Sequence, residues 1–218
     1  MSLKPYQRDF IEYAISHDIL SFGSFTLKSG RVSPYFFNAG KFNKGSSLAA
    51  IGTFYASVLQ DTGLEFDVVF GPAYKGIPLS SSTVIALAEK CNKDVPYSFN
   101  RKEIKDHGEG GKIVGAPLEG RILIVDDVIT AGTAVRESLS IIKECGATPV
   151  GVVVAVNRQE KGTGEISAVQ QIEKDYGIPV LSIVNLDQII QYIKEQGDYS
   201  EHLKKMEEYR ATYGIQTS

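Results

Sequence analysis

The chain has 218 residues, of which 43% are hydrophobic and 22% charged, and its formal net charge is −3. This length and composition favour one globular domain with a well-formed core. The slight negative charge argues against a nucleic-acid or acidic membrane partner, and apolar runs such as 152–156 are far too short to span a bilayer. We therefore expect a single domain that binds neither nucleic acid nor membrane.

The N-terminus and the cysteines favour a cytoplasmic location. Residues 1–9 lack the apolar stretch of a signal peptide. Cys91 and Cys145 each lie near the end of a predicted helix and have no metal-binding or redox spacing. We expect both to be packed thiols in a reducing compartment.

Amphipathic patterns predict the first elements of the chain. Residues 4–20 have the apolar spacing of a helix, and residues 21–40 predict two short strands joined by a turn at Ser29–Gly30. A second helix is predicted over 45–61, stopped near Gly63. Lys28 lies beside the turn.

Two adjacent aromatic residues, Phe36 and Phe37, precede Asn38 in the second of these strands. They offer aromatic faces next to an amide. Adjacent phenylalanines usually divide between core and surface, so we expect one ring to pack inward.

A glycine-rich turn separates the next strand from its helix. Residues 66–70 predict a buried strand, residues 71–78 its exit loop, and a helix then runs to Cys91. The loop holds Tyr74 and Lys75. A lysine at the carboxyl end of a strand, followed by a helix start, suits an anionic ligand, although solvated lysines are common.

A long segment without apolar periodicity follows a predicted strand at 95–100. Loops longer than about 12–15 residues in compact domains are usually functional or disordered. The cations of this segment are Arg101, Lys102, Lys105 and His107, and glycines follow at 108, 110 and 111. We predict a mobile cationic lid over about 100–116 that closes on a polyanion. The alternative is a solvated loop whose acidic residues offset its cations.

The most informative stretch runs from Arg121 to Ala134. Ile122–Val125 predicts a strand buried on both faces, and Asp126 and Asp127 follow directly. The loop Thr130–Thr133 then leads into a helix that Gly146 stops.

This loop has the composition of an anion site. Backbone N–H groups at a helix start cradle anions, Gly132 permits close approach, and Thr130 and Thr133 add hydroxyl donors. Carboxylates repel phosphate but accept hydrogen bonds from sugar hydroxyls, so Asp126 and Asp127 point to a phosphorylated sugar. The alternative, a strand end followed by a capped helix, explains neither both acids nor both threonines.

The remaining chain alternates strands and helices. Strands are predicted at 148–156 and 180–184, and helices at 165–176, from Asp187 to Gly197, and over 198–213. Arg158 follows the first of these strands and so lies on the ligand side of the sheet. The alternation from 66 to 184 predicts an α/β fold with a helix-covered, mainly parallel sheet.

We expect one domain over 1–218. Its core is residues 64–186, and an N-terminal hood of residues 1–45 packs with the C-terminal helix.

The string from Val125 to Ala134 closely resembles the diphosphoribosyl-binding signature of type I phosphoribosyltransferases. The whole chain resembles the orotate branch of that family, through four further strings: Phe25–Arg31, Ser33–Asn38, Gly71–Gly76 and Asn100–His107. The resemblance implies an open sheet covered by helices on both faces. It also implies a pentosyltransferase of pyrimidine (UMP) biosynthesis. This enzyme converts orotate and 5-phosphoribosyl 1-diphosphate into orotidine 5′-phosphate and diphosphate. Mg²⁺ would be required, and a homodimer would share the lid between subunits.

The resemblance also implies residue roles. Catalytic roles fall to Lys75, Arg101, Lys105, His107, Asp126 and Asp127. The donor would be bound by these residues together with Lys28, Tyr74, Lys102, Val128, Ile129, Thr130, Ala131, Gly132, Thr133 and Ala134. Orotate would contact Lys28, Phe36, Phe37, Thr130 and Arg158. Mg²⁺ would be held by substrate and water, with no direct protein ligand.

Two other functions are consistent with parts of the chain. One is a phosphoribosyltransferase for another nucleobase, which the Lys28 and Phe36–Asn38 segments disfavour. The other is a non-catalytic regulator that senses the phosphoribosyl donor, which would need a basic nucleic-acid-binding face.

Overall fold

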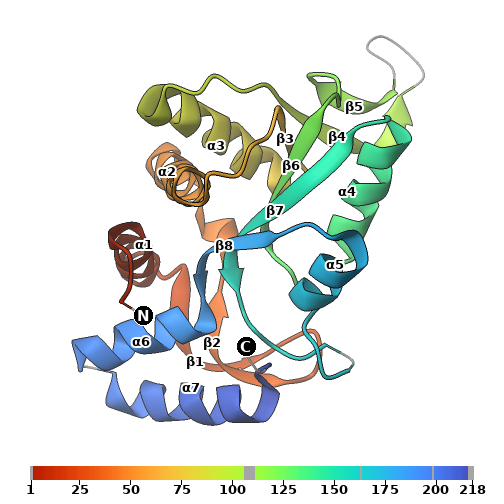
Figure 1. Cartoon of the computed structure of the whole chain (residues 1–218). Helices are drawn as coiled ribbons and strands as arrows, with labels where there is room; N and C mark the ends of the chain where they lie inside the picture. The colour runs from red at the N-terminus through yellow and green to blue at the C-terminus, as the bar shows by residue number, and fades with distance from the viewer. Residues whose placement is uncertain (1, 106–110, 163, 198, 216–218) are drawn as a thin grey trace.

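A mainly parallel sheet forms the centre of the molecule (Figure 1). The computed structural model describes residues 2–105, 111–162, 164–197 and 199–215. Within these residues the sheet has six strands in the order β5-β4-β3-β6-β7-β8. Their bounds are β3 (Val68–Gly71), β4 (Tyr97–Lys105), β5 (Gly111–Gly115), β6 (Arg121–Val128), β7 (Thr148–Asn157) and β8 (Val180–Asn185). β5 runs antiparallel to β4, and the other neighbours are parallel.

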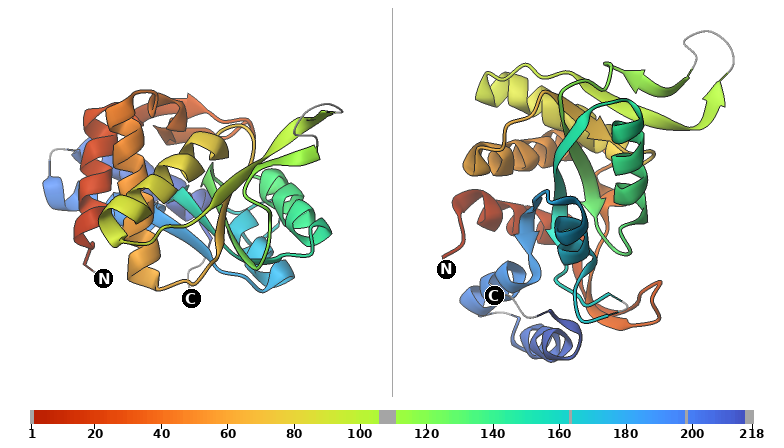
Figure 2. Two further views of the ribbon diagram at one scale, coloured as in Figure 1. Left: turned by 90° about the horizontal axis from the view of Figure 1, so that it is seen from above. Right: turned by 45° about the vertical axis from the view of Figure 1, so that its right-hand side comes forward.

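Helices cover both faces of this sheet (Figure 2). α1 (Pro5–Ser16), α2 (Gly45–Thr62) and α3 (Gly76–Cys91) lie on one face, and α4 (Thr133–Glu144) and α5 (Ala168–Tyr176) lie on the other. In β6, Leu123 and Val125 belong to the apolar cluster of α2 and α3, whereas Ile122 and Ile124 belong to that of α4 and α5. Burial on both faces explains why this strand is an unbroken apolar run.

The N-terminal strands stand apart from the central sheet. β1 (Leu20–Thr26) and β2 (Val32–Phe37) pair antiparallel around a turn in which Gly30 has φ 82°. A short 3₁₀ turn, η1 (Ala39–Lys41), follows them. The C-terminal helices α6 (Leu186–Gln196) and α7 (Ser200–Tyr213) lie at the same end of the molecule, and Tyr209 of α7 packs edge-on against Tyr35 of β2.

The predicted fold class is confirmed, and most predicted elements lie within a few residues of their observed bounds. The first helix is shorter than predicted, because the chain turns at His17 to enter β1. No helix among the described residues has the length and apolar character needed to cross a membrane.

The prediction of an irregular loop after Asn100 was wrong. β4 continues to Lys105 and pairs with β5, with Asn100 opposite Ile113 and Lys105 opposite Gly111. The described side chains of β5 are all at least partly exposed, so this edge hairpin lacks the apolar alternation that marks a half-buried strand. Residues 106–110, including His107, lie outside the described residues.

Candidate active site

The predicted ligand residues gather where the parallel strands end. β3 is paired with β4 on one side and with β6 on the other. The chain continues from β3 to β4, but from β6 to β7 in the opposite direction across the sheet. The β3–β6 boundary is therefore a topological switch point, where open α/β sheets bind ligands.

An ion pair spans this switch point. Lys75, which precedes α3, places its Nζ 2.6 Å from Oδ2 of Asp127 in β6. The Lys75 side chain is 64% exposed, whereas that of Asp127 is only 10% exposed. The carboxylate is thus held by the sheet, and it positions an ammonium group that still faces solvent.

Asp126 is fixed by backbone and side-chain contacts. Its Oδ1 accepts a hydrogen bond from the Asp127 N–H at 2.9 Å, and its carbonyl oxygen accepts one from the buried Tyr55 hydroxyl at 2.7 Å. Burial, followed by repulsion from Asp127, raises the pKa of Asp126 to about 7, although Lys75 acts to lower it. The adjacent acids therefore differ: Asp127 is ion-paired, while Asp126 titrates near neutral pH.

The loop between β6 and α4 presents backbone N–H groups. Gly132 is buried at the start of α4 with φ 75°, and a Cβ there would come within 2.8 Å of Arg136 Nη1. Arg136 also donates to the Ala131 carbonyl at 2.7 Å, which ties the loop to the helix. Thr130 and Thr133 are exposed. The first N–H groups of a helix have no intrahelical acceptors, so the loop can receive an anion.

The loop between β3 and α3 is held by Asn100. This residue of β4 is 4% exposed, and its Oδ1 accepts a hydrogen bond from the Ala73 N–H at 2.9 Å. The next peptide, Ala73–Tyr74, is cis, and Tyr74 is 70% exposed. Lys102 Nζ lies 5.6 Å from the centre of the Tyr74 ring. The hairpin and this loop thus bring a lysine and an aromatic ring together.

Three of the residues assigned to the base, Arg158, Phe36 and Phe37, lie on or directly after two strands, β7 and β2. Arg158 follows β7, and its Nη2 donates to Ser33 Oγ of β2 at 3.1 Å. Phe36 is 40% exposed and stacks on Phe25 with ring centres 5.5 Å apart. Phe37 is 8% exposed, and its ring centre lies 6.2 Å from that of Phe10. The expectation that one ring packs inward is therefore confirmed.

The other predicted site residues make fewer contacts with the rest of the site, or lie outside the described residues. Lys28 is exposed in the β1–β2 turn. Arg101 donates to the Gly111 carbonyl at 3.3 Å across the hairpin. The backbone of Lys105 ends β4, but its side chain and the whole of His107 lie outside the described residues. The other loop residues range from the buried Ile129 to the half-buried Val128 and the exposed Ala131 and Ala134.

Sequence reasoning assigned no role to three residues that support the site: Tyr55, Asn100 and Glu160. Glu160 Oε1 accepts hydrogen bonds from Arg158 Nε at 2.8 Å and from the Tyr209 hydroxyl at 3.0 Å. Asn100 carried a usable signal, because a polar residue at the carboxyl end of a strand lies on the ligand side of the sheet. Tyr55 and Glu160 carried none, since their contacts join segments 71 and 49 residues apart in the chain.

Comparisons with known proteins agree with this geometry. Residues 42–180 match the family described as "Phosphoribosyl transferase domain". The chain is 59% identical to the orotate phosphoribosyltransferase of Pseudomonas aeruginosa and 61% identical to that of Vibrio parahaemolyticus. Both matches span 213 residues, 98% of this chain and 100% of the relative. The crystal structure of the Francisella tularensis orotate phosphoribosyltransferase is 46% identical, with a TM-score of 0.86 over 94% of this chain and 99% of that one. With its acidic pair, anion loop and switch-point lysine in this fold, the chain belongs to the orotate phosphoribosyltransferase family.

Proposed function

We propose that the chain transfers the 5-phosphoribosyl group from 5-phosphoribosyl 1-diphosphate to orotate, giving orotidine 5′-phosphate and diphosphate in pyrimidine biosynthesis. The observation that carries this proposal is the Lys75–Asp127 pair beside the β6–α4 loop, at the switch point of the sheet. Side chains and N–H groups that could bind an anionic leaving group, a sugar and a phosphate thus lie together at one edge of the sheet.

The β6–α4 loop would hold the ribose 5-phosphate. The N–H groups and hydroxyls of Thr130–Thr133 would bind the phosphate, and the flanking residues Val128, Ile129 and Ala134 would complete the loop. Asp126 and Asp127 would accept hydrogen bonds from the ribose hydroxyls. Both carboxyls lie in the buried part of β6, so the sugar is oriented by rigid groups.

Cations would surround the diphosphate. As the C1–oxygen bond breaks, positive charge develops on the ribose ring and negative charge on the leaving group. Lys75 is already held beside this position by Asp127, and Lys102 Nζ lies 5.6 Å from the ring centre of the adjacent Tyr74. Arg101, Lys105 and His107 would approach from the hairpin. Cations that are placed before the bond breaks stabilise the transition state without rearranging.

Mg²⁺ would neutralise charge on the diphosphate oxygens. The described residues contain no group of three or more His, Cys, Asp or Glu side chains that could hold a metal ion. Mg²⁺ keeps several waters and binds largely through substrate phosphates, so it would need few ligands from the protein. Lys75 and the acidic pair would then orient the substrate oxygens that the ion binds.

Orotate would lie between the β1–β2 strands and the end of β7. Arg158 and Lys28 would face its carboxylate, and the exposed Phe36 and Thr130 would frame the ring, with the inward-packed Phe37 supporting this segment from behind. Because orotate is already an anion, its nitrogen needs little help from a base, and positioning should dominate.

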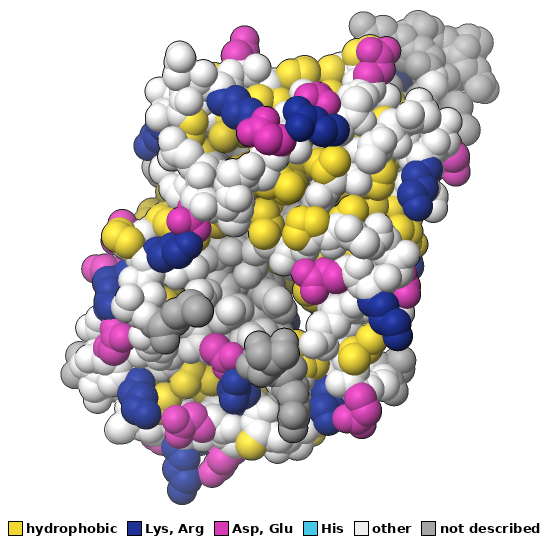
Figure 3. Space-filling model, in the orientation of Figure 1, with side chains coloured by type: hydrophobic (Ala, Val, Ile, Leu, Met, Phe, Trp, Pro, Cys, Tyr) yellow, Lys and Arg dark blue, Asp and Glu magenta, His cyan; other side chains and the backbone are white. Residues whose placement is uncertain are grey.

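We also propose a homodimer in which the β4–β5 hairpin reaches the partner's site. A groove between α2 and α3, of about 560 Å³, is lined by apolar and small residues including Leu48, Ala49, Pro78 and Ile85. Ile85 is 56% exposed, and Figure 3 shows exposed hydrophobic side chains across the half of the molecule that holds these helices. A second copy is the occupant we propose, because the hairpin projects from the same half of the molecule (Figure 2).

The dimer is tested by sedimentation of an Ile85→Glu variant. We expect it to be monomeric and inactive, while Ile166→Glu, which alters an isoleucine 37% exposed beside α5, stays dimeric. Mixing Lys105→Ala with Asp126→Asn subunits should restore part of the activity if sites are shared. A monomeric wild-type enzyme would contradict the proposal.

The proposed location is the cytoplasm, where the thiols of Cys91 and Cys145 would stay reduced. The expectation that both thiols are packed is wrong for Cys145, which is exposed. Fractionation of cells expressing the protein would test it.

The activity is tested by the loss of orotate absorbance in the presence of donor and Mg²⁺. Adenine, hypoxanthine and uracil are the controls. We expect turnover with orotate and none with the three control bases. Turnover with a control base would favour another phosphoribosyltransferase, and donor binding without any turnover would favour a regulator.

A further inference from the structure

Most of the Arg158 guanidinium is already committed to protein acceptors. Nε and Nη2 lie 2.8 and 2.6 Å from Oε1 of Glu160, and Nη2 also donates to Ser33. The guanidinium carbon lies 4.3 Å from the centre of the Tyr35 ring, which packs against it. Nη1 takes no part in these contacts. The guanidinium is therefore clamped through Nε and Nη2, and Nη1 is left for a further acceptor.

Glu160 is the centre of this clamp. Its side chain is 14% exposed, and Oε1 accepts a third hydrogen bond from the Tyr209 hydroxyl of α7 at 3.0 Å. Oε2 lies 3.7 Å from Arg31 Nη1. A carboxylate held from three directions cannot rotate freely, so it fixes the plane of the Arg158 guanidinium.

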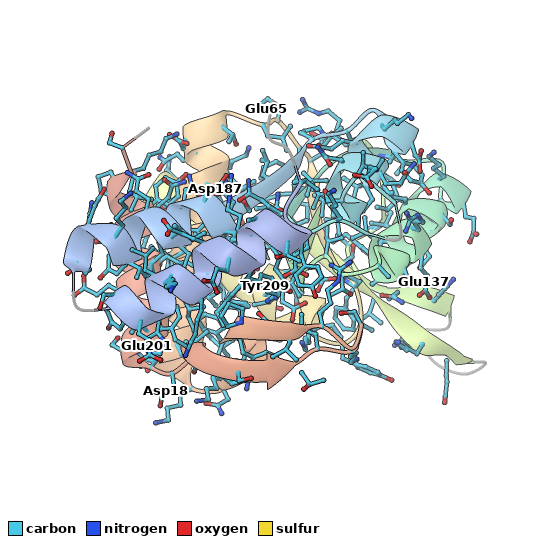
Figure 4. All side chains as sticks on the ribbon, turned by 90° about the horizontal axis from the view of Figure 1, so that it is seen from below. Asp18, Glu65, Glu137, Asp187, Glu201 and Tyr209 are labelled. Atoms are coloured by element: carbon cyan, nitrogen blue, oxygen red, sulfur yellow. The ribbon has the colours of Figure 1, made fainter. Side chains whose placement is uncertain are left out.

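The C-terminal segment also shapes the loop that carries both residues. Gln159 has φ 51° and is 7% exposed, and its side chain exchanges two hydrogen bonds with Asp187, at 2.9 and 3.2 Å. Arg210 of α7 pairs with the same Asp187. The Ile215 N–H donates to the Gln159 carbonyl at 2.8 Å. Figure 4 shows α7 beside α6, with Tyr209 between α7 and the β1–β2 sheet.

The cluster carries one more positive charge than negative charge. Arg31 and Arg158 bring two positive charges and Glu160 one negative charge. The pKa of Arg158 is raised: burial acts to lower it but is outweighed by Tyr35 and Glu160, so the guanidinium stays charged. One uncompensated positive charge behind the Nη1 edge suits a carboxylate ligand.

We propose that Glu160 and Tyr209 are positioning residues that aim Arg158 at the carboxylate of the base, which makes α7 a specificity-determining element. This inference rests on the proposed role of Arg158 in binding orotate. It extends the site to the C-terminal helix, which contributes no residue to the donor site described above. If the cluster only fastened α7 to the domain, substitutions in it would change KM for orotate and KM for the donor alike.

Steady-state kinetics of Tyr209→Phe and Glu160→Gln test the proposal. Hydrogen bonds to charged groups contribute about 1.5–3 kcal/mol, so we expect KM for orotate to rise ~10-fold or more, with KM for the donor changed less than about twofold. Tyr213→Phe is the matched control, because its ring lies on the same helix and its hydroxyl makes no hydrogen bond among the described residues. Glu207→Gln, on the exposed side of α7, controls for the carboxylate.

The outcomes separate this inference from the proposed function. A wild-type enzyme that does not consume orotate defeats the proposed function. A working wild-type enzyme whose Tyr209→Phe variant matches Tyr213→Phe defeats the inference, as does an equal rise in both KM values. If Glu160→Gln does not fold, the nearly isosteric Tyr209→Phe decides the question.

Discussion

The donor site and the base site are built in different ways. The donor loop and the acidic pair come from one continuous stretch, the end of β6 and the start of α4. The Arg158 site is assembled from the end of β7, from Ser33, 125 residues away in the chain, and from Tyr209 in the last helix. A contiguous segment gets its geometry from local backbone constraints, whereas an assembled cluster depends on the packing of distant elements.

This difference predicts where substitutions act. Changes in the β6–α4 segment should alter donor use with small effects on the rest of the fold. Changes around Arg158 should act through contacts between elements. The largest expected effect comes from Lys75, which joins the contiguous segment to the β3–α3 loop.

Lys75→Ala should lower kcat by ~10²-fold or more, as the loss of one preorganised transition-state contact does. Its stability should change by no more than about 1 kcal/mol, because the ammonium group is largely exposed. Steady-state turnover and urea unfolding would measure both, with Lys174→Ala on the exposed side of α5 as the control. Unaltered turnover would remove Lys75 from the diphosphate site.

Gly132→Ala tests whether the contiguous segment is set by its backbone. Gly132 and Gly146 have φ 75° and 77°, so alanine at either position costs ~1–2 kcal/mol of strain. A Cβ at Gly132 also meets Arg136 and Ile172, whereas at Gly146 it meets nothing within 4 Å. We expect both variants to lose stability, but only Gly132→Ala to raise KM for the donor, by ~10-fold or more. If Gly132→Ala and Gly146→Ala had the same KM for the donor, the loop would tolerate displacement.

The same contrast explains what the sequence could predict. The β6 strand, its two acids and the Thr130–Thr133 loop follow one another in the chain, so their pattern was sufficient to place them. The edge strand β5 was not predicted, because its described side chains are partly or fully exposed and pairing with β4 stabilises it. Glu160 and Tyr209 could not be connected, since only tertiary packing brings them within 3.0 Å.

Asn100→Ala sharpens the comparison, because Asn100 supports the donor site from another strand. Loss of its amide leaves the Ala73 N–H without an acceptor, which should cost ~1–3 kcal/mol of stability. The displaced loop should lower kcat/KM by ~10-fold. Asn185→Ala removes a similar bond, to the Gln188 N–H at the start of α6, and should cost stability alone. If Asn185→Ala lowered activity as much, the effect would be general instability.

The last expected effect concerns stability alone, through its dependence on pH. Folding raises the pKa of Asp126 from the ordinary 3.8 to about 7, so between these values the folded chain holds a proton that the unfolded chain has released. Stability contributed by this group is therefore complete below pH 3.8 and is lost as the pH rises to about 7, with a slope of at most ~1.4 kcal/mol per pH unit. Asp126→Asn cannot ionise and should remove this slope. Urea unfolding of the ligand-free protein between pH 5 and about 8 would measure it. Parallel curves for the two proteins would mean that Asp126 remains ionised beside Asp127, with Lys75 compensating both charges.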